Sequence, residues 1–388
     1  MKQFLKTLAL FLLPPIVLFA PATMILFYVG EFYPPQTLGE LARGPQRIIV
    51  GAAYDNTRGD YQLQETLMRQ PDVIALGTSR VGGFRSEFFK DPTIFYNDTG
   101  TGGVLSNFRY FIEATSAHPS KIIIAGMDAY FFSPEEVAKN SVVERPNPFI
   151  ARVPQYGPFF GSLFIGGGWW RIYPDYFAGK FTLQDIFDSH SGSTTRIGLR
   201  AVADRNGFLN DGSNYFGDVI GNTNNQQKAR ASIGALAASI SETNGDEYGS
   251  GISPEALMEV RRFLDTAKKQ GSIVIGFIPP LSHAEYERLR AFPDASYAYA
   301  FNNLGPVLKN LYKEYGYDFY DFTDIATFGG SDSEMVEAKH GSEKIYLRMF
   351  IQMAEKNKSL GVLVDTSFLK KKLSQATSTY EVFGLSAY

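Results

Sequence analysis

Short apolar runs that alternate with amphipathic helical segments constrain the fold of this chain more than any other feature of its sequence. We expect six buried strands, at residues 47–50, 73–77, 93–97, 121–126, 272–278 and 317–322. The clearest helix spans residues 253–271, where Ser253 caps, Pro254 opens and Gly271 closes the segment. This alternation predicts an α/β fold with a mostly parallel sheet and helices on both faces, that is, a three-layer α/β/α architecture.

One long interval, from about residue 132 to residue 251, breaks this alternation. It is rich in glycine, asparagine and aromatic residues, and it is too long for an ordinary connection between two elements. We therefore expect a large insertion within a domain that spans residues 72–388. Trp169 and Trp170 lie in its aromatic part and are candidates for a sugar-binding surface, although the same residues also suit a local core of the insertion.

The residues between Lys6 and Glu31 carry no charge, and the run is long enough to cross a bilayer as a transmembrane helix. Because Lys2 and Lys6 precede it, the positive-inside rule leaves the N-terminus in the cytoplasm. We expect a membrane anchor at residues 1–31, a juxtamembrane segment at residues 32–71 and a periplasmic C-terminal domain, which makes a single-pass protein of the cytoplasmic (inner) membrane. The sequence "APA" at residues 20–22 leaves a cleaved signal peptide as the alternative.

Charge and composition exclude several classes of function. The formal net charge is −3, so the chain offers no strongly basic field for nucleic acid. It has no cysteine, which excludes disulfides and thiolate nucleophiles. The four histidines are scattered without the spacing of metal ligands, and no glycine-rich segment has the pattern of a phosphate-binding loop. We therefore expect neither a metal nor a cofactor.

Ser79 follows the apolar run at residues 73–77 almost directly, and it is the first candidate for chemistry. A serine at the carboxyl end of a parallel strand is either a helix cap or a nucleophile. A serine nucleophile needs a base, and His340 is the best candidate because Glu337 precedes it by three residues. At that spacing the carboxylate can accept from one imidazole nitrogen and leave the other for Ser79, although a solvated glutamate near a helix-start histidine gives the same pattern.

Four short motifs, in this order, resemble those of the SGNH (GDSL-like) hydrolase superfamily, whose members have a flavodoxin-like sheet. The motifs are "GTSR" at 77–80, "NDTGTGG" at 97–103, "IIIAGMDAYFF" at 122–132 and "EAKH" at 337–340. The resemblance implies that Ser79 is the nucleophile, His340 the base and Glu337 its carboxylate partner. It also implies an oxyanion hole formed by the backbone N–H groups of Ser79 and Gly102.

Three positions depart from the family pattern. Thr78 and Glu337 stand where the family has aspartate, and Asp128 stands where the family has the asparagine that donates to the oxyanion. An ionised aspartate only accepts hydrogen bonds, so Asp128 is protonated, turned away from the oxyanion or engaged in another role. Its place in a loop after a strand also suits a capping carboxylate.

The glycine-x-aspartate motif, the N-terminal anchor and the extracytoplasmic domain resemble bacterial proteins that move acyl groups onto surface polymers, namely the D-alanyl-lipoteichoic-acid transfer protein and the alginate and peptidoglycan O-acetyltransferases. This resemblance implies an enzyme that O-acylates or deacylates a cell-envelope polysaccharide, supplied with acyl groups by an integral-membrane O-acyltransferase. Arg80 would then bind an anionic carrier or polymer, or pair with a nearby acid. A carboxylesterase for small or lipid esters and a catalytically silent binding or scaffold component of a modification or export complex are the alternatives.

Overall fold

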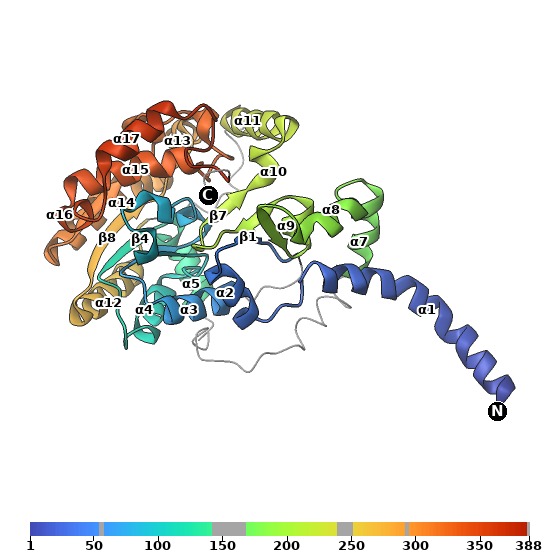
Figure 1. Cartoon of the computed structure of the whole chain (residues 1–388). Coiled ribbons are helices and arrows are strands. Elements are labelled where there is room, and N and C mark those ends of the chain that lie inside the picture. Colours follow the sequence, from blue (N-terminus) through green and yellow to red (C-terminus); the bar gives the residue numbers. More distant parts are fainter. Residues whose placement is uncertain (54–57, 142–167, 239–250, 292–294, 386–388) are drawn as a thin grey trace. The chain divides into compact units, whose positions relative to one another are not determined.

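The computed structural model describes residues 1–53, 58–141, 168–238, 251–291 and 295–385 (Figure 1). The chain divides into two compact units. Unit 1 comprises Met1–Thr57 and Ala151–Asn210, and unit 2 comprises Arg58–Ile150 and Asp211–Tyr388. The interval that was expected to be an insertion is therefore divided between the two units, with residues 151–210 in unit 1 and the rest in unit 2.

Unit 2 is built on a five-stranded parallel sheet with the strand order β3-β2-β4-β8-β9. The strands are β2 (Val73–Gly77), β3 (Phe95–Thr99), β4 (Ile122–Gly126), β8 (Ile273–Ile278) and β9 (Asp318–Asp321). Counted along the chain, this order is 2-1-3-4-5, one of the two common orders of doubly wound α/β sheets. The prediction of an α/β fold with a parallel sheet is confirmed.

Helices cover both faces of this sheet (Figure 1). Successive residues of each strand point to opposite sides, and because both sets are apolar, each face packs against helices. On one face Val73, Ile124 and Phe277 pack in a cluster with α15 (Glu343–Lys356) and α17 (Thr366–Gln375). On the other face Ile74 and Leu76 pack with α4 (Leu105–Ala114), α12 (Pro254–Gln270) and α14 (Ala295–Glu314). The remaining helices and strand of unit 2 are α3 (Arg58–Arg69), α5 (Pro134–Ser141), β7 (Asn214–Phe216), α10 (Gly217–Ile220), α11 (Thr223–Ala238), α13 (His283–Arg290) and α16 (Lys358–Gly361).

The ends of α12 follow from its local sequence. The Ser253 hydroxyl accepts from the Ala256 N–H at 3.2 Å, and Pro254 occupies the first helical position. Gly271 ends the helix with φ of 79°, in the left-handed region that other residues adopt only with strain. The predicted boundaries of this helix are confirmed.

Two predicted strands differ from the observed ones. The strand expected at residues 93–97 begins at Phe95, because Pro92–Ile94 forms a short 3-10 helix capped by the Asp91 side chain. The strand expected at residues 47–50 is present as β1 (Arg47–Val50), but it belongs to unit 1 and not to the parallel sheet. Apolar periodicity predicts a buried strand without indicating which sheet it joins.

Unit 1 has its own small sheet and its own apolar cluster. In the sheet, β1 pairs with β5 (Thr194–Ile197) in parallel and with β6 (Asn206–Phe208) in antiparallel orientation. Its helices are α1 (Lys2–Tyr28), α2 (Pro35–Arg43), α7 (Gly168–Phe177), α8 (Leu183–Phe187) and α9 (Leu199–Ala203). Ala22 and Leu26 of α1 pack with Ile172 of α7, which ties the N-terminal segment to this unit.

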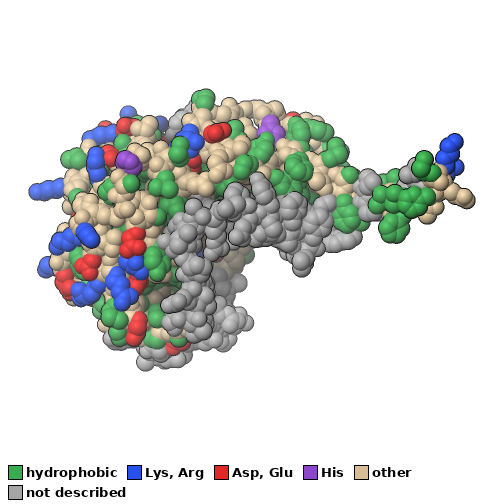
Figure 2. Space-filling model, turned by 90° about the horizontal axis from the view of Figure 1, so that it is seen from below, with side chains coloured by type: hydrophobic (Ala, Val, Ile, Leu, Met, Phe, Trp, Pro, Cys, Tyr) green, Lys and Arg blue, Asp and Glu red, His purple; other side chains and the backbone are tan. Residues whose placement is uncertain are grey.

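Figure 2 shows hydrophobic side chains along the N-terminal segment and basic side chains at its end. The sequence places Lys2 and Lys6 in the first two turns of α1. Phe4, Leu10 and Phe11 are all exposed. Within the described residues, no single helix has both the length and the apolar character needed to span a membrane. The two parts of α1, Lys2–Pro14 and Val17–Tyr28, pass that test only as a pair bent by 55°.

Candidate active site

Ser79 lies at the carboxyl end of β2, a strand inside the parallel sheet. A 3-10 helix, Ser79–Val81, follows directly, and the Thr78 side chain caps it by accepting from the Arg80 N–H at 3.1 Å. The capping role that the sequence left open for Ser79 therefore belongs to Thr78, and the Ser79 hydroxyl is not used for it.

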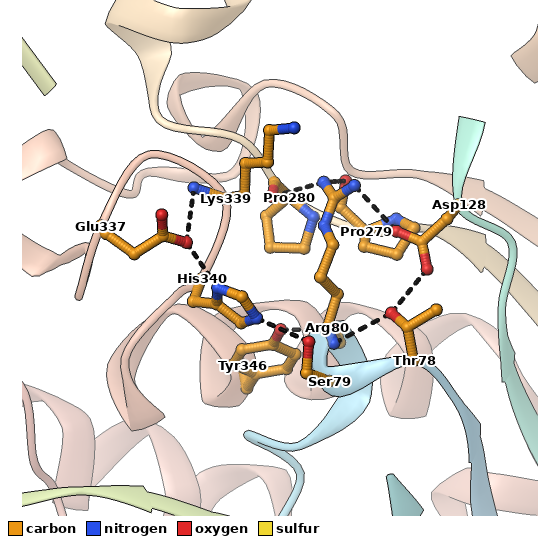
Figure 3. Close-up of polar contacts among 10 residues, drawn as sticks. All are labelled: Thr78, Ser79, Arg80, Asp128, Pro279, Pro280, Glu337, Lys339, His340 and Tyr346. Carbon is orange, nitrogen blue, oxygen red and sulfur yellow. Dashed lines mark hydrogen bonds and ion pairs between the residues drawn. The ribbon is translucent and has the colours of Figure 1, made fainter. Parts of the chain in front are cut away.

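The Ser79 hydroxyl instead meets the predicted base. Ser79 Oγ lies 2.8 Å from His340 Nε2, although 261 residues separate them in the chain. The Nδ1 atom of His340 is hydrogen-bonded to Oε1 of Glu337, and the Lys339 N–H donates to the same oxygen at 3.2 Å (Figure 3). Serine, histidine and carboxylate thus form one continuous chain of contacts, which is the arrangement that activates a serine nucleophile.

A tight turn brings Glu337 and His340 together. The Val336 N–H donates to the His340 carbonyl at 2.9 Å, and α15 begins three residues after the histidine. Burial raises the pKa of Glu337, but the hydrogen bond and charge of His340, the Lys339 N–H and the charge of Arg80 together hold the pKa below its ordinary value of 4.5. The carboxylate is therefore ionised at neutral pH and can orient and stabilise an imidazolium.

We expect Glu337→Gln to change how stability depends on pH. Because the pKa of Glu337 is lower in the folded than in the unfolded state, its pairing contributes stability that is complete above pH 4.5 and is lost as the pH falls through the folded-state pKa. The stability difference between wild type and variant should thus be constant above about pH 5 and shrink below it. Urea denaturation between about pH 7 and pH 3 measures this, and a difference that does not change with pH would contradict it.

Glycine at position 83 allows Tyr346 to pack against the turn that follows Ser79. The Tyr346 hydroxyl donates to the Arg80 carbonyl at 2.6 Å, so the ring is fixed on both its face and its tip. A Cβ atom at position 83 would lie 2.0 Å from Cδ2 of this buried ring.

We expect Gly83→Ala to destabilise unit 2 by about 1–3 kcal/mol, because the added Cβ overlaps a ring that is buried and held by its hydroxyl. Gly103→Ala is the matched control, since a Cβ there meets only the Asn107 side chain at 3.9 Å. Chemical denaturation compares the two variants, and equal stabilities would exclude this packing.

Asp128 is oriented by two neighbours of Ser79. Arg80 Nη1 donates to its Oδ1 at 2.8 Å, and the Thr78 hydroxyl donates to its Oδ2 at 2.7 Å (Figure 3). Arg80 Nη2 also donates to the carbonyls of Pro280 at 2.9 Å and Pro279 at 3.2 Å. Of the roles that the sequence left open, the carboxylate is thus turned toward Arg80 and Thr78 and serves in a buried ion pair beside the nucleophile.

The structure bears on the expected roles of Arg80 and Gly102. Of the two alternatives for Arg80, binding an anionic carrier or polymer and pairing with an acid, the structure shows the second, because Arg80 is 5% exposed and pairs with Asp128. The Gly102 N–H, expected in the oxyanion hole, donates to the Gly77 carbonyl at 3.0 Å. The sequence predicts two oxyanion donors, the N–H groups of Gly102 and Ser79. Among the described residues none accepts from the Ser79 N–H, so this amide is the one that can still donate to an oxyanion.

The strand β7 contributes two residues that sequence reasoning missed. The Asn214 N–H donates to the Gly82 carbonyl at 2.7 Å, and its side-chain amide donates to the Ser79 carbonyl at 3.3 Å. The Phe216 ring lies 5.6 Å from the imidazole of His340, measured between ring centroids. Both residues fall in the interval expected to be an insertion, and no local motif marks them.

Two of the other histidines have surroundings different from those of His340, and the side chains of the two tryptophans fall outside the described residues. His118 is exposed, and His283 Nδ1 lies 3.0 Å from Asp324 Oδ1. Trp169 and Trp170 belong to α7, but their side chains fall outside the described residues. The described part of the chain contains no group of three or more histidine, cysteine, aspartate or glutamate residues that is suited to hold a metal ion.

Comparison with known proteins adds no relative to this picture. No family model matches the chain, and no curated protein matches it. The protein is an α/β protein with a Ser-His-Glu arrangement at the carboxyl end of its parallel sheet, and the geometry of that arrangement carries the functional argument.

Proposed function

We propose that this protein is a serine acyl-transfer enzyme with Ser79 as its nucleophile. The observation that carries the proposal is the 2.8 Å contact between Ser79 Oγ and His340 Nε2, with Glu337 on the far nitrogen of the ring. A serine used only for packing or capping needs no such partner pair. The place of Ser79 at the carboxyl end of a parallel strand supports the same conclusion, because ligands of doubly wound sheets bind there.

The reaction has two steps. First, His340 Nε2 takes the proton of the Ser79 hydroxyl while Oγ attacks the carbonyl carbon of the acyl donor, and the leaving alcohol receives that proton as its bond to the carbonyl breaks. Second, an acceptor hydroxyl gives its proton to His340 and attacks the acyl-serine, which releases the new ester and restores the Ser79 hydroxyl. Glu337 stabilises the imidazolium in both steps, and the Ser79 N–H stabilises the oxyanion.

The acceptor in this proposal is a hydroxyl of a cell-envelope polysaccharide. The motifs "GTSR" and "EAKH", which resemble those of SGNH hydrolases, supply the three residues of the contact chain, and the sheet order agrees with a flavodoxin-like domain. The uncharged N-terminal segment supports a single-pass protein of the cytoplasmic membrane with a periplasmic unit 2. An integral-membrane O-acyltransferase would then supply the acyl group.

A catalytically silent binding or scaffold component is the second candidate. The observation that favours it is the engagement of both Gly102 and Asp128 by other groups, which leaves fewer donors for an oxyanion. The loss of one oxyanion donor costs about 2.7–4 kcal/mol in the transition state.

An acetyl-transfer assay with the full-length chain in detergent separates the candidates. The donor is p-nitrophenyl acetate, the acceptors are oligosaccharides of alginate, xylan and chitin, and mass spectrometry detects the acetylated product. Acetylated oligosaccharide supports the transferase, whereas acetate alone supports a carboxylesterase. A folded chain that releases neither product supports the silent component and contradicts the proposal.

A further inference from the structure

A narrow pocket opens beside the Ser-His-Glu arrangement, on the side formed by β7. Phe216 in its wall lies against the imidazole of His340, and Asn214 in its wall donates to the Ser79 carbonyl. The two residues that follow His340, Gly341 and Ser342, complete this side of the wall. The pocket therefore shares its wall with residues that contact the nucleophile and its base.

Three of the side chains that line this pocket are buried polar groups. Arg85 and Ser342 are each 3% exposed, and Glu343 is 8% exposed. Within the described residues the Ser342 hydroxyl, the Arg85 Nε and Oε2 of Glu343 have no hydrogen-bond partner. Arg85 has two charge contacts, from Nη2 to Oε1 of Glu87 at 3.5 Å and from Nη1 to Oε2 of Glu343 at 3.9 Å, and the longer one is not a hydrogen bond. Because buried polar atoms in proteins are nearly always hydrogen-bonded, this group indicates a polar ligand.

The mixture of charges indicates which kind of ligand fits. The carboxylates of Glu343 and Glu381 repel an anionic ligand, and the buried guanidinium of Arg85 repels a cationic one. Burial, followed by the charge of Glu343, raises the pKa of Glu381 above its ordinary value. A neutral hydroxyl group both donates and accepts, so it satisfies the serine, the guanidinium and the carboxylate together.

The size of the pocket limits how much of a ligand enters it. Its enclosed volume is about 20 Å³, close to the 10–15 Å³ that a single water needs on the same measure. A complete sugar ring does not fit in this space, but one hydroxyl or hydroxymethyl substituent does. The apolar wall that Phe216, Ile220 and Val336 provide suits the C–H groups that carry such a hydroxyl.

We propose that this pocket binds one hydroxyl-bearing substituent of a neutral polyol or sugar acceptor and thereby holds the neighbouring acceptor hydroxyl at the acyl-serine. The inference rests on the proposed acyl transfer and names the acceptor subsite for it. In the transfer step the bond between the acyl carbon and Ser79 Oγ breaks as the bond to the acceptor oxygen forms. The acceptor proton moves to His340 Nε2 and then to Ser79 Oγ, so no further reactant is needed.

The test compares glycerol with 1-propanol as acceptors of an acetyl group from p-nitrophenyl acetate, using the full-length chain in detergent. The two alcohols share a three-carbon chain, but only glycerol has further hydroxyls to occupy the pocket. Their product ratio at equal concentration does not depend on how fast Ser79 is acylated, so it reports the acceptor step alone. Wild type should favour glycerol.

In Ser342→Ala we expect this ratio to fall by about threefold to tenfold, the effect of losing one hydrogen bond to a neutral group. Ser342 precedes α15 but its side chain makes no capping hydrogen bond, so the helix does not depend on it. Glu343→Gln is the second variant, since its Oε1 accepts from the Phe383 N–H and an amide retains that contact. Ser374→Ala, on the exposed surface of α17, is the matched control.

Each result decides between the two proposals. A wild type that acetylates both alcohols equally, or a ratio that is the same in Ser342→Ala, Glu343→Gln and Ser374→Ala, overturns the subsite and leaves the acyl-transfer proposal intact. A folded wild type that does not react with p-nitrophenyl acetate overturns the acyl-transfer proposal, and the subsite with it.

Discussion

Replacement of Ser79 by alanine is expected to abolish covalent labelling by a fluorophosphonate probe and to lower acyl transfer by roughly 10³-fold or more. The reason is the single contact chain of the site, in which His340 activates one hydroxyl at 2.8 Å and Glu337 fixes the ring from behind. Because the three groups act as a unit, His340→Ala should remove nearly as much activity as Ser79→Ala.

Intact-mass measurement of the full-length chain after treatment with the probe checks this prediction. Wild type should carry one adduct, and both variants should carry none. Ser86→Ala is the control, because Ser86 lies seven residues further along the same segment, its hydroxyl donates to Glu87 at 3.3 Å, and its loss should leave the adduct in place. An adduct that persists in Ser79→Ala would place the nucleophile elsewhere.

Asp128→Asn is expected to destabilise unit 2 by about 3–5 kcal/mol, although asparagine is the residue that the resembled family has at this position. Arg80 and Asp128 are 5% and 0% exposed, and the variant removes the negative charge of Asp128 from this buried ion pair. The new amide N–H₂ would also face the hydroxyl of Thr78, which already accepts from the Arg80 N–H. Restoring the family residue should therefore not restore an oxyanion donor at low cost.

Urea denaturation of Asp128→Asn and Asp72→Asn provides the comparison. Asp72 pairs with Lys121 at 2.9 Å, but both side chains are exposed, so this control should lose about 0–1 kcal/mol. Equal stabilities of the two variants would contradict the buried ion pair. A double variant, Arg80→Met with Asp128→Leu, should recover part of the loss because it removes both charges.

The fold was predictable where short segments determine their own structure. The apolar strands at residues 73–77, 121–126 and 272–278 and the capped helix at residues 253–271 all appear close to the expected positions. The sheet membership of β1 was not predictable, because one strand has no sequence signal for its pairing partner.

The site was predictable only as far as the chemistry of each residue constrains it. Ser79, His340 and Glu337 were selected because a serine needs a base and a base needs a carboxylate. Arg80 contacts Asp128 and Pro280, which lie 48 and 200 residues away in the chain. The sequence around Arg80 does not indicate these contacts. The same holds for Asn214 and Phe216, which only the folded position of β7 brings to Ser79 and His340.

The contact between Thr78 and Asp128 also limits how this sequence can change over time. Thr78→Asp alone would place two carboxylates at the 2.7 Å distance now bridged by a hydroxyl, and Asp128→Asn alone would remove the carboxylate that pairs with Arg80. Each single step toward the family pattern therefore passes through a form with an unbalanced charge, whereas the joint change keeps one carboxylate near one guanidinium. We therefore expect residues 78 and 128 to be substituted together or not at all.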